Sequence, residues 1–151
     1  MTGRGTGWVV AQFTLMAAIL VAGLVPPHWP REGHFATSAV GAVLVVAGAG
    51  LAVWASRSLG RSFTPFPKPL GAGLVTEGPF AIVRHPVYTG GIAFFLGYSL
   101  CASVPAVVLT VALAALWVGK LGVEEGLLSN AYDAYPGYRR RVRWRLLPFV
   151  Y

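Results

Sequence analysis

Residues 88–119 read YTGGIAFFLGYSLCASVPAVVLTVALAALWVG, a stretch without a single acidic or basic side chain. A helix that crosses a bilayer needs about 20 largely apolar residues. Ser103, Val104 and Pro105 divide this stretch into two arms, 88–103 and 104–119, each somewhat short for a full crossing. The stretch therefore predicts a tight hairpin of two membrane helices.

Two further apolar segments, 8–25 and 37–56, precede this hairpin. The chain is 56% hydrophobic and 11% charged, whereas soluble domains carry about 25% charged residues. Residues 23–27 offer no small-x-small cleavage site, so we expect the first segment to remain as a membrane anchor. The sequence thus predicts one domain, residues 1–151, with an all-α fold: a polytopic membrane protein with four transmembrane helices.

Basic residues lie at the ends of these apolar segments. Eleven of the twelve fall on one side of the predicted membrane: Arg4, Arg57, Arg61, Lys68, Arg84, Lys120, Arg139, Arg140, Arg141, Arg143 and Arg145. Arg31 alone falls on the other side. Because cytoplasmic loops carry the excess of Lys and Arg, both termini are predicted to be cytoplasmic in an integral cell-membrane protein. A nucleic-acid partner would need these cations on a folded polar face, so we expect none.

Small residues recur at four-residue spacing on two of the apolar segments. They are Gly48, Ala52 and Ser56 on one, and Ala93, Gly97 and Cys101 on the other. Such spacing lets two helix backbones approach closely in lipid. Cys101 is the single cysteine, so no intrachain disulfide can form, and we interpret it as a small packing residue.

The interval 57–85 is rich in proline and glycine and cannot form one helix. An irregular loop with scattered apolar residues suits a cofactor pocket at the membrane surface, and a plain linker is the alternative. The next residues, Arg84, His85, Pro86 and Tyr88, place a cation, an imidazole and a phenol at the start of the third apolar segment. Pro86 suits a first helical turn, and such an N-terminus favours a carboxylate or phosphate. The alternative is anchoring at the membrane interface.

Two adjacent glutamates, Glu124 and Glu125, follow the fourth apolar segment. Carboxylates beside a bilayer are costly unless a partner holds them. Successive helical positions differ by about 100°, so one glutamate can face a pocket while the other pairs with Lys120 or water. Lys120 lies four residues before Glu124 and shares its face. A solvated helix start is the alternative, and no metal site is predicted.

A stripe of Glu124, Leu128, Tyr132 and Tyr135 then indicates an interfacial C-terminal helix, interrupted near Pro136. The tail, residues 143–149, mixes basic and aromatic residues. That mixture is typical of contact with anionic headgroups, and direct contact with a substrate is the alternative.

Taken in order, four pieces of the chain resemble the isoprenylcysteine carboxyl methyltransferase family, and the wider phospholipid methyltransferase group shares the layout. The pieces are residues 74–80, residues 83–90, the glutamate pair after a hairpin, and residues 138–149. The resemblance covers residues 57–151 and implies a binding region for S-adenosylmethionine formed by residues 70–90 and 120–142. The product of that cofactor would be S-adenosylhomocysteine.

The resemblance also implies roles for individual residues. His85 and Tyr88 would hold the methionine part of the cofactor, and Pro86 between them belongs to the same binding segment. Leu74, Val75 and Gly78 would lie near the adenosine. Glu124 or Glu125 would engage the cofactor's ammonium group, which leaves open which of the two faces it. Apart from the resemblance, we predict Glu124 and Arg84 as the catalytic residues, and Arg84 or an arginine of the tail would orient an anionic acceptor.

The sequence therefore predicts methyl transfer from S-adenosylmethionine to a lipid-like or isoprenoid acceptor at the cytoplasmic membrane face. One alternative is an NADPH-dependent membrane reductase of the sterol type, because its ending is similar to residues 145–151. The other is a non-catalytic membrane adaptor whose basic tail binds anionic lipid. The expected partners are the lipid bilayer and a lipophilic methyl acceptor, whose reacting atom stays open.

Overall fold

The computed structural model describes residues 3–30, 34–66 and 73–150, with the backbone alone for residues 3 and 4. Arg31, Lys68 and the first residues of the predicted cofactor region, 70–72, lie outside the described residues, as does the side chain of Arg4. Every regular element in this part of the chain is a helix. The predicted all-α fold is therefore confirmed.

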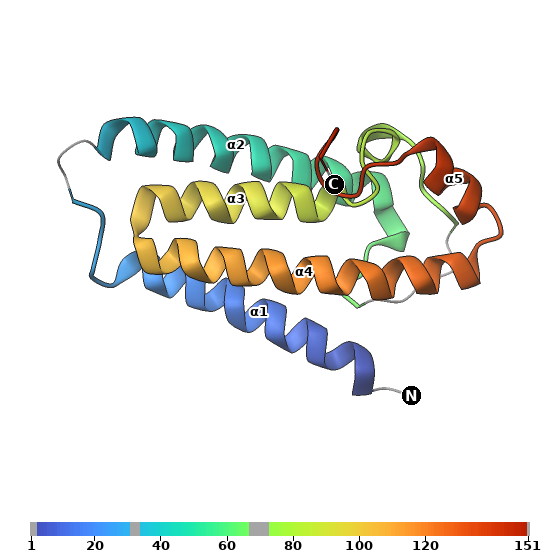
Figure 1. Cartoon of the computed structure of the whole chain (residues 1–151), viewed down its shortest axis with the longest axis horizontal. Coiled ribbons are helices and arrows are strands. Elements are labelled where there is room, and N and C mark those ends of the chain that lie inside the picture. Colours follow the sequence, from blue (N-terminus) through green and yellow to red (C-terminus); the bar gives the residue numbers. More distant parts are fainter. Residues whose placement is uncertain (1–2, 31–33, 67–72, 151) are drawn as a thin grey trace.

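Four long helices form the body of the protein: α1 (Gly3–Leu24), α2 (His34–Leu59), α3 (Pro86–Ala102) and α4 (Val104–Ala131). A short helix, α5 (Tyr135–Arg141), follows them, and two short 3-10 helices, η1 (Gly60–Ser62) and η2 (Gly78–Ala81), lie between α2 and α3. Figure 1 shows α3 between α2 and α4, with α1 packed along α4. The start of α1, the α2–α3 connection and α5 all lie at the same end of the bundle. The segments that carry most of the candidate site residues are thus gathered at one end.

Three segments are long and apolar enough to cross a membrane: Gly5–Leu24, His34–Ser62 and Val104–Ala131. The remaining long helix, α3, is apolar but has only 17 residues. At about 1.5 Å per residue it extends roughly 26 Å, against a hydrocarbon core of about 30 Å. Length and composition therefore support three of the four predicted crossings, and a crossing by α3 stays a prediction.

The helix α4 is longer than its predicted membrane segment. The prediction ended at Gly119, where the charged residues begin, but the helix continues for three more turns to Ala131. It does so because Lys120 and both glutamates find partners within the fold instead of needing a solvated loop. The extended helix carries these side chains along the polar end of the bundle.

The predicted hairpin between α3 and α4 is confirmed, and Ser103 alone connects the two helices. The Ser103 hydroxyl accepts a hydrogen bond from the backbone N–H of Ala106 (3.3 Å) and donates one to the carbonyl of Ala22 in α1 (2.8 Å). It therefore caps α4 and ties the hairpin to the end of α1.

The close approach predicted from small residues is found between α2 and α3. A Cβ atom at Gly90 would lie 2.6 Å from the backbone nitrogen of Ala52 and 2.7 Å from the Gly48 carbonyl oxygen, too close for a side chain. The buried positions of α2, namely Gly41, Gly48 and Ala55, recur every seven residues and not every four. Two helical turns of about seven residues return the same face to the partner.

Substituting Gly90 with valine is expected to destabilise the bundle by about 1–3 kcal/mol, because overpacking forces the two helix backbones apart. Thermal unfolding in detergent would measure this as a lowered midpoint. Gly50→Val is the matched control, since Gly50 lies on α2 and a Cβ atom there meets nothing within 4 Å. Equal midpoints for the two variants would contradict the interpretation of the α2–α3 contact.

Candidate functional site

A cavity of about 550 Å³ lies at the polar end of the bundle. All four long helices contribute to it, and so do the segment 62–66, the loop around Leu74 and Val75, and α5. Its walls are mostly apolar, and its charged lining residues are Arg84, Lys120 and Glu124, with His85 beside them. The cavity therefore brings together polar groups from both sides of the α3–α4 hairpin.

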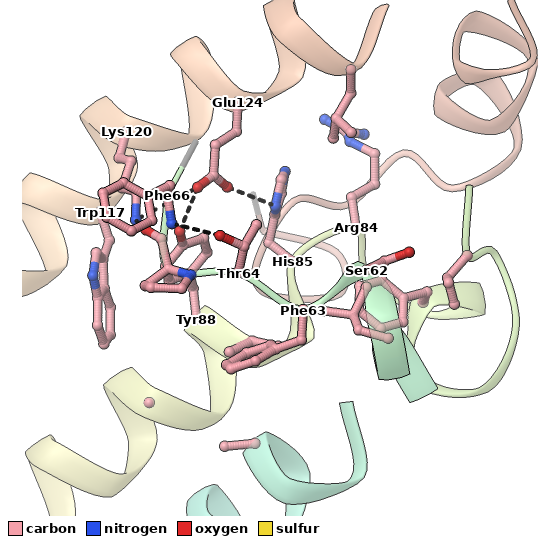
Figure 2. Close-up of a pocket in the computed structure, with 18 of the residues that line it drawn as sticks. Ser62, Phe63, Thr64, Phe66, Arg84, His85, Tyr88, Trp117, Lys120 and Glu124 are labelled. Atoms are coloured by element: carbon pink, nitrogen blue, oxygen red, sulfur yellow. Dashed lines mark hydrogen bonds and ion pairs between the residues drawn. The ribbon is translucent and has the colours of Figure 1, made fainter. Parts of the chain in front are cut away.

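The carboxylate of Glu124 lies at the centre of this polar group, as Figure 2 shows. It accepts a hydrogen bond from the Tyr88 hydroxyl (2.7 Å) and lies 3.6 Å from the Lys120 ammonium. The Nδ1 atom of His85 lies 4.0 Å from its second oxygen. Lys120 and Glu124 share a helix face as predicted. A fixed negative charge is thus held inside a cavity whose other walls are largely apolar.

Lys120 ties the segment around Pro65 and helix α1 to this site. Its ammonium group is fully buried and donates hydrogen bonds to the Gln12 Oε1 atom (2.8 Å) and the Pro65 carbonyl (2.7 Å). The indole N–H of Trp117 donates to the same Gln12 oxygen (3.3 Å). The sequence reasoning missed Gln12. Its signal was that of a polar side chain within an apolar membrane segment, which by itself marks a candidate functional position.

Glu125 has a different environment from its neighbour. The residue is 3% exposed, and its Oε1 atom accepts from the Nε and Nη2 atoms of Arg84, both at 2.9 Å. Arg145 Nη2 lies 3.0 Å from the other oxygen, and His85 Nε2 lies 3.2 Å from Oε1. The expectation that this glutamate pairs with Lys120 or water is therefore wrong. It pairs with two arginines because its face of α4 points toward the start of α3 and the tail.

Arg84 also fixes the C-terminal tail. Its Nη1 atom donates to the carbonyl oxygens of Val142 (2.8 Å) and Arg143 (2.7 Å). The backbone N–H groups of residues 84 and 85 donate to the carbonyls of residues 144 and 145, each at 2.9 Å. The tail is thereby hydrogen-bonded to the N-terminal end of α3, where the first N–H groups of a helix lack partners within the helix.

Two tyrosines of α5 are buried beside the cavity. The Tyr138 hydroxyl donates to the Phe80 carbonyl (2.8 Å), and burial raises its pKa well above the usual range. Burial, reinforced by the negative charge of Glu125, raises the pKa of Tyr135 to about 12. Both hydroxyls therefore stay protonated at neutral pH. The four residues of the predicted stripe, Glu124, Leu128, Tyr132 and Tyr135, all line the cavity. The prediction of one continuous helix was wrong, because α4 ends at Ala131 and Tyr135 begins α5.

The predicted site residues divide into two groups. Those that line the cavity are Leu74, Val75, Arg84, His85, Tyr88 and Glu124. Gly78, Pro86 and Glu125 lie outside its lining: Gly78 begins η2 with a positive φ of 59°, and Pro86 begins α3 as predicted. Pro136 lies in the first turn of α5 and does not interrupt it, because the break falls earlier, between Ala131 and Tyr135. Among the described residues no cluster of His, Cys, Asp or Glu could hold a metal ion.

Three segments that are apolar enough to cross a membrane, with a largely apolar cavity that holds polar side chains at one end of the bundle, indicate a helical membrane protein. The family model described as phospholipid methyltransferase matches residues 36–135, which includes the α3–α4 hairpin and both glutamates. The chain belongs to the phospholipid methyltransferase family. The resemblance predicted from the sequence is confirmed at this level.

Two relatives are similar to parts of the chain. Protein-S-isoprenylcysteine O-methyltransferase B of Arabidopsis thaliana is 30% identical over 115 residues, which cover 72% of this chain and 58% of the relative. The cobalt-zinc-cadmium resistance protein CzcN of Cupriavidus metallidurans is 33% identical over 70 residues, which cover 45% of this chain and 32% of the relative. The chain thus matches less than two thirds of the length of either relative.

Proposed function

We propose that this protein transfers a methyl group from S-adenosylmethionine to a lipid-like or isoprenoid acceptor at the cytoplasmic end of the helix bundle. One observation carries the proposal: the Glu124 carboxylate is held between Tyr88, His85 and Lys120 inside a largely apolar cavity. Family membership supports the reaction class. The cytoplasmic face follows from the positive charge at this end of the chain.

The residues present fit a cofactor that carries positive charge. A cavity of about 550 Å³ falls within the range of roughly 300–1,000 Å³ that small-molecule sites occupy. The Glu124 carboxylate would attract the ammonium or sulfonium group of the cofactor. The Tyr88 and Trp117 rings, with centroids 5.1 Å apart, also line this cavity, and aromatic faces attract cations.

Bound S-adenosylmethionine would supply an electrophilic methyl group on a sulfonium, whose sulfur takes back the bonding electron pair when the acceptor attacks. The chain's own residues bind and orient the reactants. Glu124 holds the cationic part of the cofactor, Tyr88 fixes Glu124, and the apolar walls exclude water that would compete with the acceptor. Placing two reactants in line is itself a large source of rate enhancement.

A lipophilic acceptor is supported by the side of the cavity that α1 and α2 form. Phe13 of α1 and Val53 of α2 line the cavity yet are 50% and 48% exposed. Both lie within helices that are apolar enough to cross a membrane. The cavity therefore reaches a surface that would face lipid, and an acceptor's apolar chain can enter there while its polar end reaches Glu124.

Ligand-induced thermal stabilisation of the detergent-solubilised protein tests the proposal. S-adenosylmethionine and S-adenosylhomocysteine are each expected to raise the unfolding midpoint, because a ligand at 100 times its Kd stabilises the folded state by about 2.7 kcal/mol. NADPH is expected to leave the midpoint unchanged. Stabilisation by NADPH alone would favour the sterol-type reductase instead. An unfolding midpoint that neither S-adenosylmethionine nor S-adenosylhomocysteine changes would contradict the proposal.

Tyr88→Phe is expected to weaken S-adenosylmethionine binding about 10-fold, because the hydroxyl that orients Glu124 is lost. Isothermal titration calorimetry in detergent measures the change. Tyr98→Phe is the matched control, since the Tyr98 hydroxyl donates to the Leu20 carbonyl away from the cavity. The role assigned to Tyr88 is wrong if both variants bind the cofactor with equal affinity.

A further inference from the structure

The Tyr135 hydroxyl is a buried polar group without a hydrogen-bond partner within the described residues. Tyr135 is 1% exposed and lines the cavity. Tyr88 and Tyr138 line the same cavity, and their hydroxyls have partners: Tyr88 donates to Glu124 and Tyr138 donates to the Phe80 carbonyl. Since buried polar groups in folded proteins are nearly always hydrogen-bonded, the unpartnered hydroxyl indicates that a ligand completes it.

The surroundings of Tyr135 indicate the shape of that ligand. Leu74, Leu128 and Tyr132 pack against the cluster that Tyr135 forms with Tyr138 and Val142. The Tyr135 and Tyr138 rings lie with their centroids 5.9 Å apart at 60°. Apart from hydroxyl groups this part of the cavity is apolar and aromatic. It suits a flat ring with a polar edge, and the nearby charges of Arg84 and Glu125 are paired with each other.

The residues of α4 that line the cavity lie at different heights along the helix, and this separates the apolar part of the cavity from the Glu124 carboxylate. Glu124 and Leu128 both line the cavity, one helical turn apart, which is about 6 Å along the axis. Tyr132 lies at the end of the helix, roughly another 6 Å further. The cavity therefore has one end at the Glu124 carboxylate and another at Leu128 and Tyr132, the residues against which Tyr135 packs. An elongated ligand with a cationic end and a planar ring would fill both.

Resting on the methyltransferase function proposed above, we infer that the Tyr135 hydroxyl hydrogen-bonds the purine ring of the cofactor and so determines nucleoside specificity. The purine edge offers both ring nitrogens that accept and an exocyclic amine that donates, and a hydroxyl can do either. Tyr135 is a specificity-determining residue in this assignment and takes no part in methyl transfer. Its ring is held in place by the packing of α5, whether or not the ligand is bound.

Tyr135→Phe separates this role from a structural one. S-adenosylhomocysteine binding, measured by calorimetry, is expected to weaken about 5- to 10-fold, the effect of one lost hydrogen bond. The affinity for adenosine, measured in competition with S-adenosylhomocysteine, is expected to fall by the same factor. The unfolding midpoint of the unliganded protein is expected to stay the same or rise, because no hydrogen bond of the free protein is removed.

Tyr138→Phe is the matched control, since it deletes a hydroxyl from the same helix that does have a protein partner. It is expected to lower the unfolding midpoint of the unliganded protein. The inference is overturned if the affinity of Tyr135→Phe for S-adenosylhomocysteine is within twofold of the wild-type affinity. It is also overturned if the affinity for S-adenosylhomocysteine falls while that for adenosine does not. A wild-type protein that binds neither S-adenosylmethionine nor S-adenosylhomocysteine would instead overturn the proposed function.

Discussion

Glu124→Gln is expected to weaken S-adenosylmethionine binding about 10- to 100-fold, the range for losing a hydrogen-bonded charge interaction. The variant keeps an acceptor oxygen for the Tyr88 hydroxyl but removes the negative charge that attracts the cofactor's cation. Lys120 still donates to Gln12 and to the Pro65 carbonyl. The fold is therefore expected to stay intact, with an unfolding midpoint close to that of the wild type.

Calorimetry of the purified variant measures the affinity, and turnover with a radiolabelled methyl group measures the rate. Glu77→Gln is the control, because it removes the same charge from an exposed residue outside the cavity. Only the substitution at Glu124 should reduce affinity. If Glu124→Gln and Glu77→Gln bind S-adenosylmethionine equally well, the cavity-facing carboxylate is not the cofactor's anionic partner.

The sequence predicted the parts of this site that local pattern determines. An uncharged stretch with a Ser-Val-Pro break predicts a helical hairpin, and the hairpin brings the ends before residue 88 and after residue 119 together. Arg84, His85 and Tyr88 must then meet Lys120 and Glu124 if the arms pack along each other. Predicting that these residues lie close together required only the lengths of the two helices.

The sequence did not determine which glutamate faces the cavity. Glu124 and Glu125 differ by about 100° around the helix axis, but the rotation of α4 depends on what packs against it. In the structure Trp117 and Lys120 of α4 are held by Gln12 of α1, and this fixes the rotation. The local pattern around residue 124 cannot predict that contact, because Gln12 lies more than a hundred residues away in the sequence.

Backbone acceptors were equally hidden from the sequence. The Pro65 carbonyl accepts a hydrogen bond from the Lys120 ammonium, and carbonyls of the tail accept hydrogen bonds from the Arg84 guanidinium. Every residue carries a carbonyl, so no residue type marks those that a buried cation will use. The tail was predicted from its basic and aromatic residues to contact headgroups or substrate, and its backbone contact with α3 had no signal in the side chains.

Glu125→Gln is expected to lower the free energy of unfolding by about 3–5 kcal/mol, the usual effect of removing one partner from a buried ion pair. Arg84, itself buried, would be left without a counter-charge, and Arg145 would lose its carboxylate contact. The neutral amide can accept one hydrogen bond but cannot balance two guanidinium groups. Because Arg84 also holds the tail carbonyls, residues 142–146 are expected to detach first.

Thermal unfolding measures the loss of stability, and hydrogen exchange of residues 142–146 measures the detachment of the tail. Glu77→Gln is the control for the same change in net charge, because Glu77 is exposed and lies outside the ion pairs of Glu125. Adjacent glutamates should then give opposite results: Glu124→Gln loses ligand affinity with little loss of stability, and Glu125→Gln loses stability first. If Glu125→Gln unfolds at the wild-type temperature while losing cofactor affinity, Glu125 rather than Glu124 faces the ligand, and the orientation of α4 that the site depends on is wrong.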